Sequence, residues 1–246
     1  MNTQMLLQYF AAEVVSSLHG MIINDTSGRP AAVVIGSFAS GGALPWNIRG
    51  RRVWIAVALA SKRGINQPWN LSSSDENFVD IPTIENPTNS WRLAGNPASA
   101  DGTGPYVSPL STEAHMDASF VFSNTVKNSK ELTSAILARN ANYMAAKFCR
   151  AVTLADGFGA MDLPSIDVLM RIYQARTVID SLDSTATANA AKKLTAWGFG
   201  SAGGAYVWSA SELNSSSAWH VSSGGSLVNS GKYNLFGCVP ALEIPA

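Results

Sequence analysis

The chain has 246 residues, of which 46% are hydrophobic and only 14% charged, and this excludes an intrinsically disordered protein because ample apolar area offsets the entropy lost on ordering the backbone. The 17 basic and 17 acidic residues balance without any basic run, which argues against binding to nucleic acid, because such proteins need clustered positive charge to neutralise phosphates. The many Ser, Asn, Thr and Gly residues predict a neutral polar surface suited to recognition or assembly.

The N-terminal segment, residues 1–20, is predicted to form an amphipathic helix. Its apolar positions follow helical spacing: Leu6, Leu7, Phe10, Val14 and Leu18. Glu13, His19 and Gly20 interrupt the apolar character, and no basic residues precede the run, so the segment matches neither a signal peptide nor a membrane span. We expect this helix to pack on the domain or to dock on a neighbouring subunit, without insertion into a membrane.

The remaining residues, 21–246, are predicted to form a single α+β domain. Apolar runs separated by turns predict core strands at residues 21–23, 31–35 and 53–59. Between residues 61 and 109 the composition changes to Asn, Ser, Pro and Gly, with Trp69 and Trp91 embedded in it. This predicts a long, ordered surface loop that is pinned by the two indole rings.

Helical patterns occupy the middle of the chain, and strand patterns return at its end. Helices are predicted over residues 130–154, from Ser165 as the N-cap onwards, and over the Ala-rich stretch 185–197. Short apolar runs between residues 205 and 242 predict an antiparallel meander. Strands at both ends with helices between them indicate that the two ends share one antiparallel sheet.

Five short motifs in the second half of the chain occur in a characteristic order. They are Ala145–Cys149 (AAKFC), Leu163–Leu169 (LPSIDVL), Trp208–Glu212 (WSASE), Ala218–Val221 (AWHV) and Lys232–Asn234 (KYN). In this order they resemble the C-type-lectin-like domains of bacterial surface proteins and phage proteins, a family that includes variable proteins diversified by retroelements. The resemblance covers residues 149–242 well and residues 33–59 and 101–146 more loosely. It implies the C-type-lectin-like fold.

The resemblance also implies that Cys149, on a helix, and Cys238, in the final strand, approach each other. Many lectin-like domains join these two elements by a disulfide. The sequence leaves open whether the two cysteines are oxidised or remain two buried thiols. No close pair of cysteines and no nearby His pattern occurs, so a structural metal site is not expected.

No catalytic constellation is evident. The three histidines, His19, His115 and His220, lie outside any nucleophile motif, and the Gly-rich stretch 198–204 lacks the ending of a phosphate-binding loop. The sulfatase-activating oxidases share the lectin-like fold but use two reactive cysteines in a different arrangement. The calcium-ligand motifs of animal lectins, Glu-Pro-Asn and Trp-Asn-Asp, are absent as well. We therefore expect no enzymatic activity, no cofactor and no metal.

The segment 212–236 is the candidate site. In the variable members of the family, the matching segment lines an exposed binding face. The resemblance implies ten ligand-binding residues: Glu212, Asn214, Ser216, Trp219, His220, Ser222, Asn229, Tyr233, Asn234 and Phe236. Aromatic rings give contact area at low entropic cost, and Ser and Asn give adaptable hydrogen bonds. Trp208 is expected in the core and Trp219 either there or at the ligand; because Trp219 and His220 alternate along a strand, only one of them should face the core.

The expected function is non-catalytic binding. The resemblance favours a phage virion surface protein that recognises a host-cell receptor, protein or glycan, at a tail or head fibre. Such a protein would be made in the host cytoplasm without a signal peptide and released by lysis. One alternative is a decoration or adaptor subunit that contacts neighbouring virion proteins, and another is a bacterial surface binding protein. In each case we expect a homo-oligomer or a part of a larger assembly.

Overall fold

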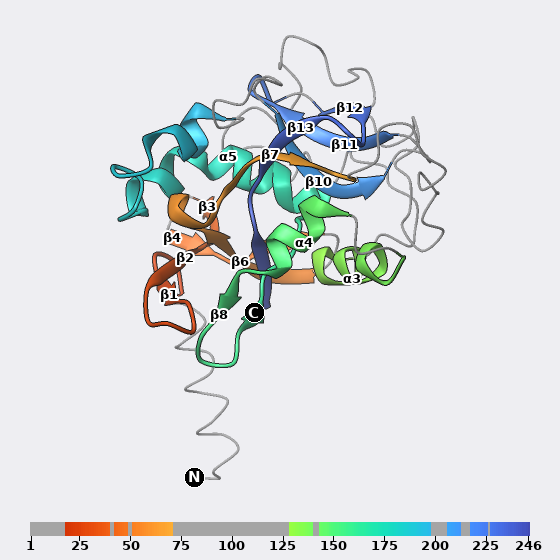
Figure 1. The fold of residues 1–246 in the computed structure, drawn as a ribbon. Coiled ribbons are helices and arrows are strands. Elements are labelled where there is room, and N and C mark those ends of the chain that lie inside the picture. Colours follow the sequence, from red (N-terminus) through yellow and green to blue (C-terminus); the bar gives the residue numbers. More distant parts are fainter. Residues whose placement is uncertain are drawn as a thin grey trace, which may run out of the picture.

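The computed structural model describes residues 18–39, 42–48, 51–70, 128–139, 143–197, 206–212, 217–225 and 227–246 (Figure 1). Within these residues the protein is mixed α+β, with mostly antiparallel sheets and three α-helices. The helix predicted for residues 1–20 lies outside the described residues except for its last three positions, and so does most of the loop predicted for 61–109.

The first sheet contains strands from both ends of the described chain. Its order is β1 (Ile22–Asn24), β2 (Pro30–Ile35), β6 (Arg51–Ala58) and β14 (Ala241–Pro245), and β5 (Trp46–Ile48) also pairs with β6. All of these pairings are antiparallel, with Val33 and Ala241 both opposite Val57 on the two sides of β6. The prediction that the two ends share one antiparallel sheet is confirmed. A separate ribbon joins β3 (Ser37–Ala39) to β4 (Gly42–Leu44).

The second sheet is built mainly from the C-terminal part of the chain. Its order is β12 (Leu227–Gly231), β11 (Ser217–Ser222), β10 (Tyr206–Glu212), β13 (Leu235–Cys238) and β7 (Gly64–Pro68). The hairpins β10–β11 and β11–β12 form the predicted antiparallel meander, whereas β13 pairs parallel to β10 and antiparallel to β7.

Two predicted boundaries in these sheets are wrong. The run expected from Lys232 to Leu242 is two strands, β13 in the second sheet and β14 in the first, because Pro240 lacks the N–H that a continuous strand would need. The start of the predicted loop is also structured, since Ala60–Lys62 form the 3-10 helix η1 and β7 follows it.

The helices depart from the sequence pattern in one place and follow it in another. The helix predicted over 130–154 is two helices, α3 (Ser129–Arg139) and α4 (Met144–Arg150), followed by the short ribbon of β8 (Thr153–Leu154) and β9 (Gly159–Ala160). Helix α5 (Ile166–Leu182) begins directly after Ser165, as predicted. The Ser165 side chain makes no capping hydrogen bond to the helix backbone, and its hydroxyl donates to the Asp167 carboxylate instead.

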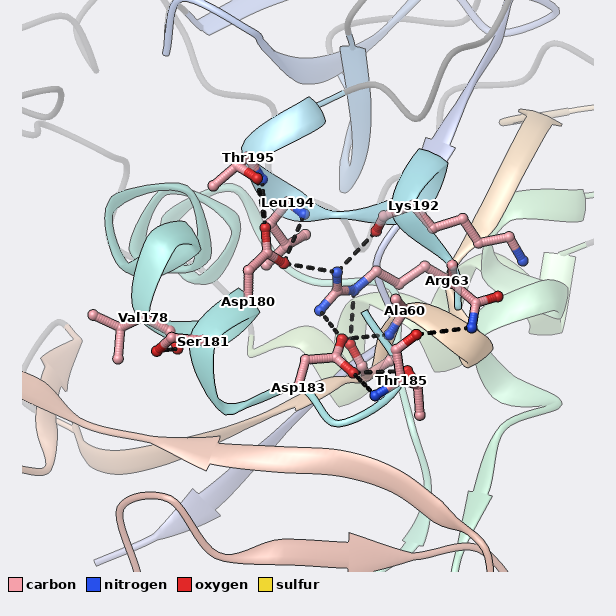
Figure 2. A network of polar contacts seen from close by, with 12 residues as sticks. Ala60, Arg63, Val178, Asp180, Ser181, Asp183, Thr185, Lys192, Leu194 and Thr195 are labelled. Atoms are coloured by element: carbon pink, nitrogen blue, oxygen red, sulfur yellow. Dashed lines mark hydrogen bonds and ion pairs between the residues drawn. The ribbon is translucent and has the colours of Figure 1, made fainter. Parts of the chain in front are cut away.

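The prediction of a helix over residues 185–197 is wrong. The chain forms two single 3-10 turns there, η3 (Ala190–Lys192) and η4 (Leu194–Ala196). The backbone N–H groups of Leu194 and Thr195 donate to the Asp180 carboxylate at the end of α5, at 2.9 and 2.8 Å (Figure 2). These tertiary bonds hold the backbone in a shape that the Ala-rich composition alone does not favour.

Helices cover the second sheet on both faces. Val207 and Val221 point toward α5 and share a core cluster with it, whereas Trp208 and Ala210 pack in another cluster with residues of α3 and α4. Both sets of alternating side chains are therefore removed from water through the middle of β10 and β11. Trp208 is fully buried, which confirms its predicted place in the core.

Candidate functional site

The ten predicted site residues fall into three groups. Asn214, Ser216 and the side chain of Glu212 lie outside the described part of the structure. Trp219, His220 and Phe236 are buried. Ser222, Asn229, Tyr233 and Asn234 are partly or fully exposed. Of the seven predicted side chains that the structure describes, only the four in the last group can meet a ligand without a rearrangement of the core.

Trp219 and His220 are both buried, although they alternate along β11. Trp219 packs in the cluster on the α5 face, and His220 lies on the opposite face among the rings of Tyr206, Trp208 and Phe236. The expectation that only one of the two faces the core is wrong, because helices cover both faces of the sheet. Trp219 thus occupies the core position that the sequence left open.

The His220 imidazole packs as a neutral aromatic ring. Its centroid lies 4.8 Å from those of Tyr206 and Phe236 and 5.5 Å from that of Trp208. Its Nε2 lies 2.8 Å from the Ser230 hydroxyl oxygen. Burial lowers the pKa of His220 to about 3, because the cationic form would lose its hydration there. The ring is therefore uncharged near neutral pH.

The turn between β12 and β13 presents Tyr233 to solvent. The backbone N–H of Asn234 donates to the carbonyl of Gly231 at 3.0 Å and closes the turn. The Tyr233 side chain is 50% exposed. Its ring lies over Gly231, where a Cβ would come within 2.7 Å of the ring. Glycine at position 231 therefore allows the ring to rest against the backbone.

Lys232, the residue before Tyr233, anchors this turn. The Lys232 side chain is fully buried, with its ammonium 4.9 Å from the centre of the Trp69 ring. Its carbonyl accepts a hydrogen bond of 2.9 Å from the Asn70 N–H. Trp69 donates in turn to the Ser209 carbonyl at 2.8 Å and contacts Tyr143 edge-on. The turn that carries Tyr233 is thus connected through Lys232 and Trp69 to β10 and to the start of α4.

Three further residues near Tyr233 are partly or fully exposed. Asn229 lies on the same face of β12 as Gly231, because alternate residues of a strand share a face, so it lies on the side that the Tyr233 ring covers. Leu235 is 46% exposed and points away from the face of the buried Phe236. We define the Tyr233 surface as Asn229, Tyr233, Asn234 and Leu235. Ser222 lies at the other end of the β11–β12 hairpin and is not part of it.

The sequence prediction included Tyr233, Asn229 and Asn234 of this candidate surface, but neither Leu235 nor the anchoring role of Lys232. Lys232 belongs to the KYN motif, and both of its neighbours in the chain are uncharged. That isolated charge was the available sign of a special role for Lys232. Its burial against Trp69 depends on a contact between residues that are far apart in the sequence.

Away from the Tyr233 surface, the described residues line grooves that include the following two. One of about 540 Å³ lies beside the β1–β2 turn, η1 and β7, where Lys62 forms an ion pair of 2.7 Å with Asp25. The other, of about 610 Å³, follows β14 and includes Asp162. Burial raises the pKa of Asp162 to about 6, although the Arg150 guanidinium lies 2.6 Å away. Among the described residues, neither groove brings together three or more His, Cys, Asp or Glu side chains that could hold a metal ion.

The two cysteines are neighbours in the core. Cys149 on α4 and Cys238 on β13 belong to the same buried cluster, and both are free thiols in this structure. Burial, together with a hydrogen bond to Cys238, raises the pKa of the Cys149 thiol. Cys238 lies in the penultimate strand rather than in the final strand that the sequence suggested.

Comparisons with protein-family models, with curated proteins and with solved structures found no match for this chain. Among the described residues, no helix has the length and apolar character needed to cross a membrane.

Proposed function

We propose that the protein is a non-catalytic recognition protein that binds its partner through the Tyr233 surface. The observation that carries this proposal is a half-exposed tyrosine ring on a turn whose adjacent lysine is fully buried. A soluble domain normally exposes large apolar side chains singly, but here Tyr233 and Leu235 lie two residues apart and are both about half exposed. Such a pair can bury substantial apolar area on contact with a partner.

The rigidity of the turn supports binding rather than a purely structural role. A partner loses part of its affinity when it must order a mobile side chain, at about 0.5–1.5 kcal/mol for each flexible one. The Tyr233 ring rests on Gly231, and the turn is held by Lys232 through Asn70 and Trp69, so most of this ordering has already occurred. The amides of Asn229 and Asn234 next to the ring supply hydrogen-bonding groups, the combination common in adaptable binding surfaces.

We further propose that the fold is C-type-lectin-like and that the protein acts on a phage virion, where it recognises a host receptor of protein or glycan character. The motif resemblance supports this, and so do the sheet shared by the two ends and the helices between. In this proposal the second sheet carries the recognition surface. A neutral polar composition suits a partner that is met through contact rather than through long-range charge.

Loss of cell attachment tests the proposal. Labelled purified protein is incubated with a panel of bacterial strains, and wild type is compared with a Tyr233→Ala, Leu235→Ala double variant. We expect at least a tenfold loss of affinity for the strains that bind, because a central aromatic anchor contributes about 2 kcal/mol or more.

The matched control is an Ile22→Ala, Leu44→Ala double variant, which removes similar exposed apolar area from the first sheet and its neighbouring ribbon. Circular dichroism establishes that each variant is folded. Equal attachment by the two double variants would contradict the proposed surface. Absence of wild-type attachment to every strain would favour a decoration subunit, for which incorporation into particles is the appropriate measurement.

A further inference from the structure

The two larger sheets have five edge strands in the described part of the chain: β1, β5, β14, β7 and β12. An edge strand presents backbone N–H and C=O groups that can pair with a strand of another molecule. Natural proteins restrain this pairing with short edges, bulges, prolines and charged side chains. The five edges differ in these features.

Four of the edges carry such restraints. β1 has three residues, and its register shifts between Ile23 and Asn24. β5 is equally short, with three residues. In β14, Pro245 lacks an N–H, Glu243 adds a charge, and Asp162 exchanges two backbone hydrogen bonds with Ala241 at 2.8 and 2.9 Å. β7 ends at Pro68, has Asn66 in the left-handed region at φ 52°, and shifts register against β13.

The fifth edge, β12, carries none of these restraints within its described backbone. Its five residues, LVNSG, include no proline and no charge. It pairs with β11 in an unbroken register from Leu227 opposite Val221 to Gly231 opposite Ser217. Val228 is 37% exposed and Asn229 is exposed. Figure 1 shows β12 at the rim of the second sheet.

We propose that two copies of this chain pair through the outer edges of β12, antiparallel across a two-fold axis, so that the two five-stranded sheets become one of ten strands. Among the described edge strands, only β12 lacks these restraints, so its best partner is the β12 strand of a second copy. An edge that pairs with its own copy leaves no free β12 edge, so assembly through it stops at a dimer. The strand has no charge, and the whole chain has a formal net charge of 0, so neither local nor long-range repulsion opposes the contact. This inference goes beyond the proposed recognition role and does not depend on it.

The proposed two-fold axis determines which residue lies opposite Asn229. It is the central residue of the strand, so a two-fold axis at the middle of β12 places Asn229 opposite its own copy. Residues directly opposite in an antiparallel pair have Cβ atoms about 4.5–5.5 Å apart, and like charges placed there are destabilising. A lysine at this position should therefore weaken the dimer, whereas a cysteine should link the two copies.

Sedimentation velocity of the full chain over a range of concentrations tests the inference. We expect a monomer–dimer equilibrium for wild type and at least a tenfold higher dissociation constant for Asn229→Lys. Thr187→Lys is the matched control, since it adds the same charge at an exposed position after α5 and should leave the equilibrium unchanged. Under mild oxidation, Asn229→Cys should form a disulfide-linked dimer and Thr187→Cys should not, because the native cysteines are buried.

A wild-type protein that stays monomeric at every concentration would overturn the inference. So would a dimer that Asn229→Lys leaves intact, because another surface would then hold the copies together. Both readouts are made without any receptor, so failure of the dimer and failure of recognition at the Tyr233 surface are separate results.

Discussion

Replacement of Arg63 with alanine is expected to lower the free energy of unfolding by about 3–5 kcal/mol. Arg63 is fully buried next to η1 (Figure 2). Its Nη1 lies 3.2 Å from Asp180 Oδ1, and its Nη2 lies 3.1 Å from Asp183 Oδ2. Its Nε donates to the Ala58 carbonyl and its Nη1 to the Lys192 carbonyl, both at 2.8 Å. The guanidinium thereby connects the end of β6 with the end of α5 and with η3.

The large effect arises because alanine leaves carboxylates without their counter-charge in the interior. The Asp183 side chain is fully buried and also accepts from the Ala60 N–H at 2.6 Å, so it cannot move into water without breaking η1 away from α5. Desolvation of an unpaired charge costs more than loss of a surface ion pair. The same loss would release the Lys192 carbonyl and loosen η3, which ends at Lys192, and η4, which follows it.

Urea denaturation followed by circular dichroism at pH 7 measures this effect. Arg63→Lys should lie between wild type and Arg63→Ala, since it keeps the charge but loses the planar fork that reaches both carboxylates. Arg52→Ala, which removes an exposed arginine of β6, should change stability by no more than about 0.5 kcal/mol. If Arg63→Ala lies within 1 kcal/mol of wild type, roughly the cost of a surface ion pair, the network is not a stabilising element.

Acidification from pH 6.5 to pH 4 is expected to cost wild type about 3 kcal/mol more stability than it costs a His220→Gln variant. Burial lowers the pKa of His220 to about 3 in the folded protein, against an ordinary value of 6.5. Between these two values the unfolded chain binds more protons than the folded chain. The contribution of His220 is therefore complete above pH 6.5 and is lost as the pH falls toward 3.

Urea denaturation at a series of pH values gives this slope for each protein. Asp162 acts in the opposite direction, because burial raises its pKa to about 6 and acidification to pH 4 relieves a buried charge. It is present in both proteins and cancels from the difference. His19→Gln is the matched control, and it should change the slope less because its imidazole is only partly buried. Parallel pH curves for wild type and His220→Gln would show that the His220 imidazole is hydrated in the folded protein.

Part of this architecture could be predicted from the sequence. The continuous apolar runs at 31–35 and 53–59 correspond to the central strands β2 and β6, because strands buried on both faces need apolar residues at every position. The start of α5 after Ser165 was predicted from the residue type, although the Ser165 side chain caps no backbone group, and the β10–β12 meander was predicted from the turn residues between its strands. Asn229, Tyr233 and Asn234 of the candidate Tyr233 surface came from the motif resemblance, whereas Leu235 did not.

Only the tertiary structure decided the rest, because it depends on residues that are distant in the sequence. The Ala-rich stretch 185–197 favours a helix by composition, yet Asp180 takes its backbone N–H groups and 3-10 turns form. Trp219 and His220 alternate as a half-exposed strand would, yet helices cover both faces of the sheet. Whether Tyr233 would be a mobile surface ring or a fixed one depended on the burial of Lys232 against Trp69, which lies more than a hundred positions earlier in the chain. Local sequence determines which backbone shapes are favourable, whereas packing determines which faces and which charges are removed from water.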